Sequence, residues 1–236
     1  MHFCGVAFAW VMNLAQQSAD VHNCGGDDVY KWKRKHMTGL LAQFPPYSGI
    51  KVAIETGLYK GDSAIELSGL FRVWHVVEIN AEYITAARKR LDLAGIVNVL
   101  TYHGDTRDIL PRLCATIREP AVIMLDAHYS RAMGADHHGP PGADFTLYAE
   151  LAAVSKRPYA DLVLVDDWAL AGQEQPSLRA DGDTSSQWES LSRARVCAAL
   201  GRIAWVAEYP PRTDPRRPNP IAALAIWREA AEPEMK

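Results

Sequence analysis

The sequence is organised around residues 50–63, I-K-V-A-I-E-T-G-L-Y-K-G-D-S, a pattern typical of a strand, a glycine turn and the start of a helix. The apolar run at its beginning suits a strand that is covered on both faces. Gly57 and Gly61 bracket the turn, where the backbone changes direction sharply and a ligand can approach it closely. Glu55 therefore lies at the carboxyl end of a strand, where open α/β sheets bind their ligands.

Three later apolar segments are also followed by an acidic residue. The segment V-W-H-V-V-E ends in Glu78, about twenty residues after the glycine turn, a spacing at which a carboxylate can accept both ribose hydroxyls of a nucleoside. The next β-rich run is followed by H-G-D-T, which contains Asp105, and the run A-V-I-M-L ends at Asp126. Together with Glu55, four predicted strands thus end in acidic residues.

This order of motifs resembles that of the class I S-adenosylmethionine-dependent methyltransferases, which carry a glycine loop with an acid and further acids after the second, third and fourth strands. The resemblance covers residues 50 to about 228. It implies an α/β fold with a Rossmann-like, seven-stranded, mostly parallel sheet, helices on both faces and an antiparallel last strand. We expect a methyltransferase domain over residues 50–236, preceded by a helical extension or cap over residues 1–49.

The resemblance implies S-adenosylmethionine as the cofactor. It assigns to cofactor binding Glu55, Gly57, Gly61, Ser63, Glu78, Asp105, Thr106 and Asp126. Glu78 is expected on the ribose, Asp105 near the adenine and Gly57 close to the methionine moiety. Asp62 or Ser63 is also expected to cap the helix after the loop.

Asp126, Asp166 and Asp167 are expected to meet, because the ends of the fourth and fifth strands are neighbours in a doubly wound sheet. Three converging carboxylates repel one another unless a cation or protons intervene, and Mg²⁺ prefers such oxygen ligands. The arrangement is similar to that of metal-dependent O-methyltransferases that act on macrolide sugars, but this chain has D-A-H-Y-S after the fourth strand. In the alternative interpretation, Asp126 only orients the methionine end of the cofactor, and Asp166 and Asp167 cap the following segment.

His128 stands two residues beyond Asp126; both are predicted catalytic residues, with His128 as the base. Histidine titrates near neutral pH, so its side chain can take the proton of a substrate hydroxyl. His137 and His138, in the same polar loop, are competing candidates that can line the pocket, bind a metal or remain solvated.

The predicted activity is methyl transfer to a hydroxyl of a small molecule or sugar, as in natural-product biosynthesis, by in-line attack on the sulfonium methyl with help from Mg²⁺ or a histidine base. The alternatives are an N-methyltransferase acting on a small molecule or peptide, and a non-catalytic nucleoside-binding module with a methyltransferase fold. An NAD-dependent oxidoreductase is disfavoured because the loop E-T-G-L-Y-K-G lacks the G-x-G-x-x-G spacing.

Composition limits the partners and the compartment. The chain has 236 residues and a net charge of −3, which offers no general attraction to nucleic acid or acidic membranes. Its four cysteines show no C-x-x-C spacing, in agreement with a reducing cytoplasm. Residues 3–15 are apolar but too short to span a bilayer, and no Lys or Arg precedes Lys31. We expect this segment to pack on the core or to form a homodimer contact.

Overall fold

The structure is a computed structural model, which describes residues 32–43, 47, 49–127, 146–168, 171–172, 190–209 and 223–232. Contacts between residues divide the chain into two compact units, Met1–Tyr30 and Lys31–Lys236. Every described residue belongs to the second unit. The predictions for residues 3–15 and for a separate cap therefore lie largely outside the described residues.

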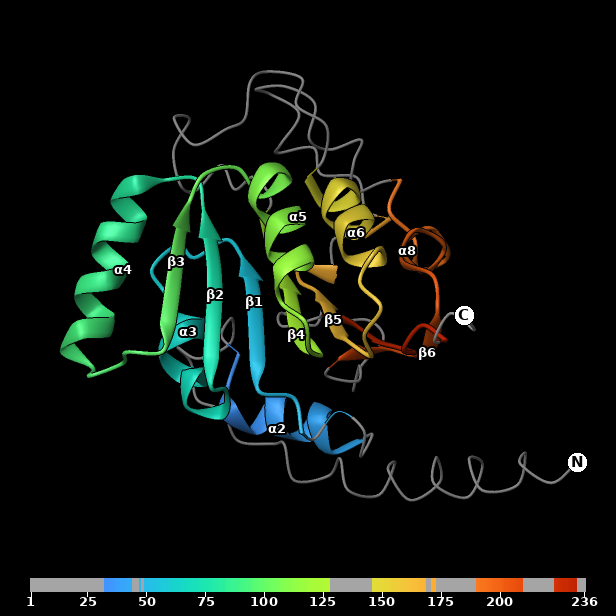
Figure 1. Cartoon of the computed structure of the whole chain (residues 1–236), viewed down its shortest axis with the longest axis horizontal. Helices are drawn as coiled ribbons and strands as arrows, with labels where there is room; N and C mark the ends of the chain where they lie inside the picture. The colour runs from blue at the N-terminus through green and yellow to red at the C-terminus, as the bar shows by residue number, and fades with distance from the viewer. Residues whose placement is uncertain are drawn as a thin grey trace, which may run out of the picture. The chain divides into compact units, whose positions relative to one another are not determined.

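The second unit is built on a seven-stranded sheet with the strand order β3-β2-β1-β4-β5-β7-β6 (Figure 1). The strands are β1 (Val52–Thr56), β2 (Val73–Glu78), β3 (Val99–His103), β4 (Ala121–Leu125), β5 (Leu162–Val165), β6 (Ile203–Tyr209) and β7 (Ala223–Arg228). Strands β1 to β5 pair in parallel, and β7 runs antiparallel between β5 and β6. The predicted fold class is confirmed.

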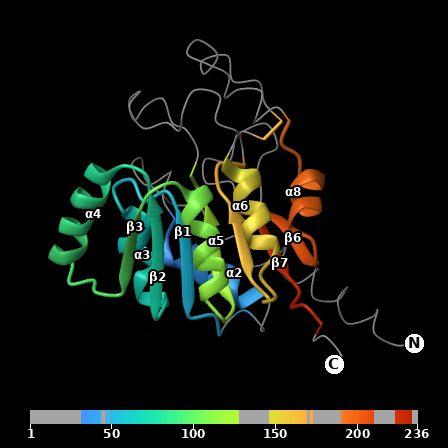
Figure 2. The same cartoon turned by 45° about the horizontal axis from the view of Figure 1, so that its top comes forward.

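Helices cover both faces of the sheet, as Figures 1 and 2 show. They are α2 (Arg34–Gln43), α3 (Asp62–Leu67), α4 (Ala81–Leu93), α5 (Thr106–Thr116), α6 (Thr146–Ser155) and α8 (Arg193–Leu200). Helices α2, α3 and α4 pack in one hydrophobic cluster with one face of the sheet, and α5, α6 and α8 pack in a second cluster with the other. The central strands β1 and β4 are buried at every position, which explains their continuous apolar sequences.

Helix starts are set by local side chains and by one glycine. Asn80 caps α4 as the sequence predicts, with its side chain accepting a hydrogen bond of 2.8 Å from the Glu82 N–H. The predicted cap of α3 by Asp62 or Ser63 is wrong, because Gly61 holds the N-cap position at φ 74° and no side chain caps the helix. A positive φ suits glycine, and α3 therefore begins directly at Asp62.

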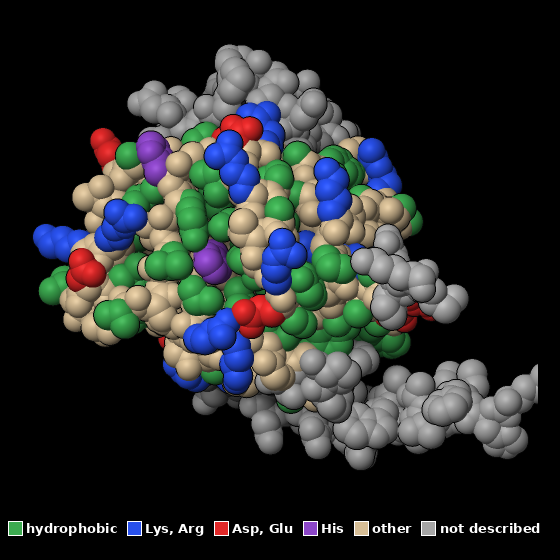
Figure 3. Space-filling view, in the orientation of Figure 1, with side chains coloured by type: hydrophobic (Ala, Val, Ile, Leu, Met, Phe, Trp, Pro, Cys, Tyr) green, Lys and Arg blue, Asp and Glu red, His purple; other side chains and the backbone are tan. Residues whose placement is uncertain are grey.

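Helix α2 belongs to the sheet unit. Its residues Met37 and Leu40 have no exposed area and lie in the same cluster as the strands. On the face shown in Figure 3, Lys and Arg side chains are scattered among hydrophobic and neutral ones. Within the described part of the chain, no helix has the length and apolar character that crossing a bilayer requires.

Candidate functional site

The candidate site lies at the carboxyl ends of the parallel strands, where the chain order reverses between β1 and β4. Strand β1 pairs with β2 on one side and β4 on the other, so the ends that carry Glu55 and Glu78 are neighbours. The Asp126 N–H donates to the Thr56 carbonyl oxygen at 3.2 Å, and the Asp166 N–H donates to the Leu125 carbonyl oxygen at 3.1 Å. The sheet therefore brings together acids that the sequence separates widely.

The glycine loop is held tightly between β2 and β4. The Gly57 N–H donates to the Val77 carbonyl oxygen at 2.8 Å, and the Gly57 backbone has φ 87°. A Cβ atom at this position would lie 2.7 Å from the Asp126 carbonyl oxygen, which is backbone and cannot move aside easily. Both the backbone angle and the space therefore require glycine here.

Glu78 fixes the glycine loop through its carboxylate. Its Oε2 accepts hydrogen bonds from the N–H groups of Leu58 at 2.9 Å and Tyr59 at 3.0 Å, and its Oε1 accepts one from the Asn80 N–H at 2.8 Å. A carboxylate offers about four acceptor positions, so this arrangement leaves room for about one further hydrogen bond. Glu78 thus holds the loop in shape and keeps acceptor capacity for a hydrogen-bond donor of a ligand.

Glu55 is almost completely buried, with an exposed fraction of 1%. Burial raises the pKa of its carboxyl to about 8, although a hydrogen bond from Ser63 acts in the opposite direction. Within the described residues, its Oε2 atom has no hydrogen-bond partner. A positively charged ligand beside Glu55 would favour the ionised carboxylate and would lower this pKa.

Asp126, like Glu55, has a carboxyl group whose pKa is raised by its surroundings. Burial raises the pKa of its carboxyl well above the ordinary value, and the charges of Asp166, Asp167, Glu55 and Glu150 raise it further. The sequence predicts that Asp126, Asp166 and Asp167 converge, and the charges of Asp166 and Asp167 do act on the Asp126 carboxyl. Glu150, which comes from α6 and is 1% exposed, was not predicted, although an acid inside the apolar segment T-L-Y-A-E-L was a usable signal.

The residues after β5 form a compact acidic turn. The Asp167 N–H donates to Asp166 Oδ1 at 3.0 Å, and Asp167 has φ 49°, an angle that is uncommon for a residue other than glycine. Trp32 Nε1 donates to Asp166 Oδ2 at 3.4 Å, and the Trp32 ring stacks on Tyr209 with centroids 6.2 Å apart. Sequence reasoning missed Trp32, because nothing in its local pattern connects it to this turn.

The acidic turn has few features of a metal site within the described residues. Both carboxylate oxygens of Asp166 already accept hydrogen bonds, from Asp167 N–H and Trp32 Nε1–H. The described part of the chain contains no group of three or more His, Cys, Asp or Glu side chains arranged to hold a metal ion. Among the described residues, Asp126, Asp166 and Asp167 are therefore not arranged as a three-ligand metal site, and the metal stays a prediction.

Asp105 and Thr106 begin α5, beside the end of β3. Asp105 caps the helix by accepting from the Arg107 N–H at 2.8 Å, and it also pairs with the Arg107 guanidinium at 2.6 Å. The hydrogen bonds from the Arg107 side chain lower the pKa of the Asp105 carboxyl. Thr106 is buried, and its Oγ1 has no hydrogen-bond partner within the described residues. The predicted base His128 and its competitors His137 and His138 lie outside the described residues.

Comparison with known structures shows what this architecture is similar to. An O-methyltransferase from Bacillus cereus in complex with S-adenosylhomocysteine is 15% identical, with a TM-score of 0.55 over 94% of this chain and 90% of that chain. The O-methyltransferase TomG from Streptomyces achromogenes, involved in tomaymycin synthesis and solved with S-adenosylmethionine, is 14% identical, with a TM-score of 0.52 over 95% of this chain and 89% of that chain. No protein-family model and no curated protein matches the sequence. The chain therefore has the fold of the class I S-adenosylmethionine-dependent methyltransferases.

Proposed function

We propose that this protein is an S-adenosylmethionine-dependent methyltransferase. The observation that carries this proposal is a group of acids that repel one another at the switch point of the sheet, beside a glycine loop that Glu78 holds in shape. Glu55 and Asp126 have raised pKa values there, so the site is poised for a ligand that brings positive charge. S-adenosylmethionine brings a sulfonium and an ammonium group, together with ribose hydroxyls that suit Glu78.

The described residues have separate roles in this proposal. Glu78 accepts a ribose hydroxyl, and Gly57 lets the loop turn tightly against the Asp126 backbone at the end of β1. Glu55 and Asp126 face the positively charged methionine end. The protein contributes mainly by aligning the sulfonium methyl group with the acceptor atom and by excluding water.

The acceptor in this proposal is a hydroxyl group of a small molecule or sugar. The two neighbours named above are O-methyltransferases, which supports this choice without fixing it. His128 is the proposed base for the hydroxyl proton. Mg²⁺ assistance is a separable part of the proposal: Asp126, Asp166 and Asp167 would supply carboxylate oxygens, and the ion would acidify the accepting hydroxyl when bound.

The first experiment measures cofactor binding by isothermal titration calorimetry with S-adenosylmethionine and S-adenosylhomocysteine on the full chain. We expect saturable binding of both ligands, and lost or weakened binding in Glu78→Ala. Glu119→Gln, which breaks an exposed surface ion pair with Arg72, is the control and should bind normally. A folded wild-type protein that binds neither ligand would refute the proposed function.

The second experiment identifies the acceptor. The protein is incubated with S-adenosylmethionine and panels of hydroxyl-bearing and amine-bearing small molecules, and methylated products are detected by mass spectrometry. Oxygen methylation that EDTA abolishes and Mg²⁺ restores would support the full proposal, whereas full activity in EDTA would remove the metal.

An N-methyltransferase is the second candidate, because carboxylates gathered at one site also attract an ammonium group of an acceptor. Methylation confined to the amine panel would favour it over O-methylation. Cofactor binding without turnover on either panel would instead favour the non-catalytic nucleoside-binding module.

A further inference from the structure

The carboxylate of Asp166, directly after β5, has a hydrogen-bond donor on each of its oxygens. Its Oδ1 accepts from the Asp167 N–H at 3.0 Å, and its Oδ2 accepts from Trp32 Nε1 at 3.4 Å. The backbone of Asp166 is fixed as well, because its N–H donates to the Leu125 carbonyl oxygen at 3.1 Å. Two of these contacts come from the strand ends and their turn. The third comes from a side chain 134 residues earlier in the chain, so the orientation of the carboxylate depends in part on Trp32.

The Trp32 ring is itself held by two aromatic neighbours. It stacks on Tyr209 with centroids 6.2 Å apart and an angle of 7° between the planes. His36 meets both rings edge-on, with centroids 6.5 Å from Trp32 and 6.3 Å from Tyr209. His36 lies in α2, whose Met37 and Leu40 anchor the helix in the core. Trp32 is only 5% exposed, so its ring packs as part of the core and does not offer a face to a ligand.

These aromatic rings lie at the edge of the sheet that carries the candidate site. Strand β6 runs in the same direction as β5, because each of them pairs antiparallel with β7. Tyr209, the last residue of β6, therefore lies at the carboxyl edge, as Asp166 does. Burial is the main cause of the raised pKa values of Glu55 and Asp126, and the charge of Asp166 adds to both. The position of the Asp166 charge thus affects the two acids that face the methionine end in the proposed function.

We propose that Trp32 is a positioning residue whose indole N–H aims the Asp166 carboxylate into the group of acids, so that the site favours a sulfonium over a neutral thioether. The inference rests on the proposed function, because it concerns the methionine end of the same site. The attraction between a carboxylate and a sulfonium depends on their separation and is strong where water is excluded, whereas a neutral sulfur gains no such attraction. Trp32 acts through Asp166 and does not itself contact the cofactor.

The test is calorimetric binding of S-adenosylmethionine and S-adenosylhomocysteine to the full chain, read as the ratio of their two dissociation constants. Trp32→Phe keeps an aromatic ring for Tyr209 but removes the N–H. It should weaken S-adenosylmethionine binding by about threefold to tenfold, the scale of one lost hydrogen bond, and S-adenosylhomocysteine binding by clearly less. Asp166→Asn should shift the ratio in the same direction by at least as much, because it removes the charge itself.

The chain offers a matched control in Trp168→Phe. Trp168 is also 5% exposed, and its Nε1 donates to a carboxylate oxygen, Glu208 Oε1, at 3.3 Å. It packs in the hydrophobic cluster on the other face of the sheet from that of Trp32. The control therefore removes the same kind of hydrogen bond from an equally buried indole without touching Asp166. Its ratio of dissociation constants should equal that of the wild type.

A double-variant cycle shows whether Trp32 acts through Asp166. Adding Trp32→Phe to Asp166→Asn should leave the ratio where Asp166→Asn alone puts it. An equal loss for both ligands in Trp32→Phe would reduce Trp32 to a packing role, and a further shift in the double variant would overturn the route through Asp166. If Trp32→Phe does not fold, as circular dichroism would reveal, an unchanged ratio in Asp166→Asn still overturns the inference. Failure of the wild type to bind either ligand would instead refute the proposed function itself.

Discussion

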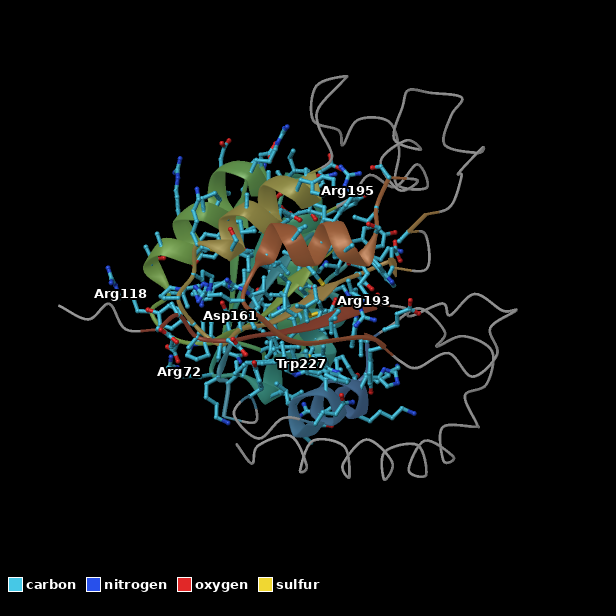
Figure 4. The ribbon with its side chains drawn as sticks, turned by 90° about the vertical axis from the view of Figure 1, so that its right-hand side faces the viewer. Arg72, Arg118, Asp161, Arg193, Arg195 and Trp227 are labelled. Atoms are coloured by element: carbon cyan, nitrogen blue, oxygen red, sulfur yellow. The ribbon has the colours of Figure 1, made fainter. Side chains whose placement is uncertain are left out.

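A buried ion cluster near the amino-terminal ends of β4 and β5, at the opposite end of these strands from the candidate site, provides a sharp test of the fold. Asp161 lies just before β5. The side chains of Asp161, Arg157 and Arg228 are all fully buried. Its carboxylate accepts four hydrogen bonds, from Ala121 N at 2.9 Å, Arg157 Nε at 2.9 Å, Arg157 Nη2 at 3.0 Å and Arg228 Nη1 at 3.3 Å. Figure 4 shows Asp161 inside the molecule, whereas Arg72 lies at its edge.

We predict that Asp161→Asn strongly destabilises the protein. The substitution keeps the shape of the side chain but removes its negative charge. Among these contacts, Asp161 provides the only carboxylate that pairs with the two buried guanidinium groups. Several backbone carbonyls, including that of Cys114, also accept hydrogen bonds from Arg157, but they carry no full charge. Removing one partner of a buried ion pair costs about 3–5 kcal/mol. A domain typically has only about 5–15 kcal/mol of stability, so the melting temperature should fall by roughly 10 °C.

The assay is urea unfolding followed by circular dichroism, with the free energy of unfolding taken from the midpoint and slope. Glu119→Gln, in the exposed pair with Arg72, is the control and should cost less than about 1 kcal/mol. The Asp161 cluster lies away from the carboxyl ends of the strands, so the folded Asp161→Asn protein should keep its affinity for S-adenosylhomocysteine. A loss below about 1 kcal/mol in Asp161→Asn would refute the reasoning, because the backbone carbonyls alone would then compensate the buried charges.

Three further predictions concern the site. Glu78→Gln should weaken S-adenosylhomocysteine binding by about 1.5–3 kcal/mol in calorimetry, because an acceptor charge is lost; unchanged affinity would contradict its assignment to the ribose. Gly57→Ala should lower the free energy of urea unfolding by more than Gly95→Ala, since both have positive φ but only at Gly57 would the new Cβ meet backbone, at 2.7 Å; equal losses would contradict this reading. Burial raises the pKa of Glu55 from 4.5 to about 8, so the folded state holds a proton that the unfolded state releases within this range. The contribution of Glu55 to the free energy of unfolding is thus present below about pH 4.5 and is lost as the pH rises towards about 8. The loss amounts to a few kcal/mol, at about 1.4 kcal/mol per pKa unit. Thermal melts of Glu55→Gln should show a flatter pH dependence than those of the wild type, and parallel curves would count against the raised pKa.

The sequence by itself determined the fold class and predicted the place of the candidate site. Continuous apolar runs such as A-V-I-M-L require strands buried on both faces, and the acids that follow them must collect at one edge because parallel strands share their direction. The glycine turn was also readable, since Gly57 and Gly61 both have the positive φ that glycine accepts most readily. The helix start after it was misread, because the sequence does not show whether a polar side chain or a left-handed glycine opens a helix.

Only the tertiary structure decided which groups meet across long distances in the chain. Trp32 reaches Asp166 over 134 residues, and Glu150 adds its charge to that of Asp126 from a helix on one face of the sheet. Local patterns carry no information about such contacts, because they depend on how whole elements pack. The engagement of Asp105 by Arg107 is local, yet a sequence cannot show whether a carboxylate is paired or open to a ligand. That choice depends on side-chain orientation and burial, which the packed structure alone determines.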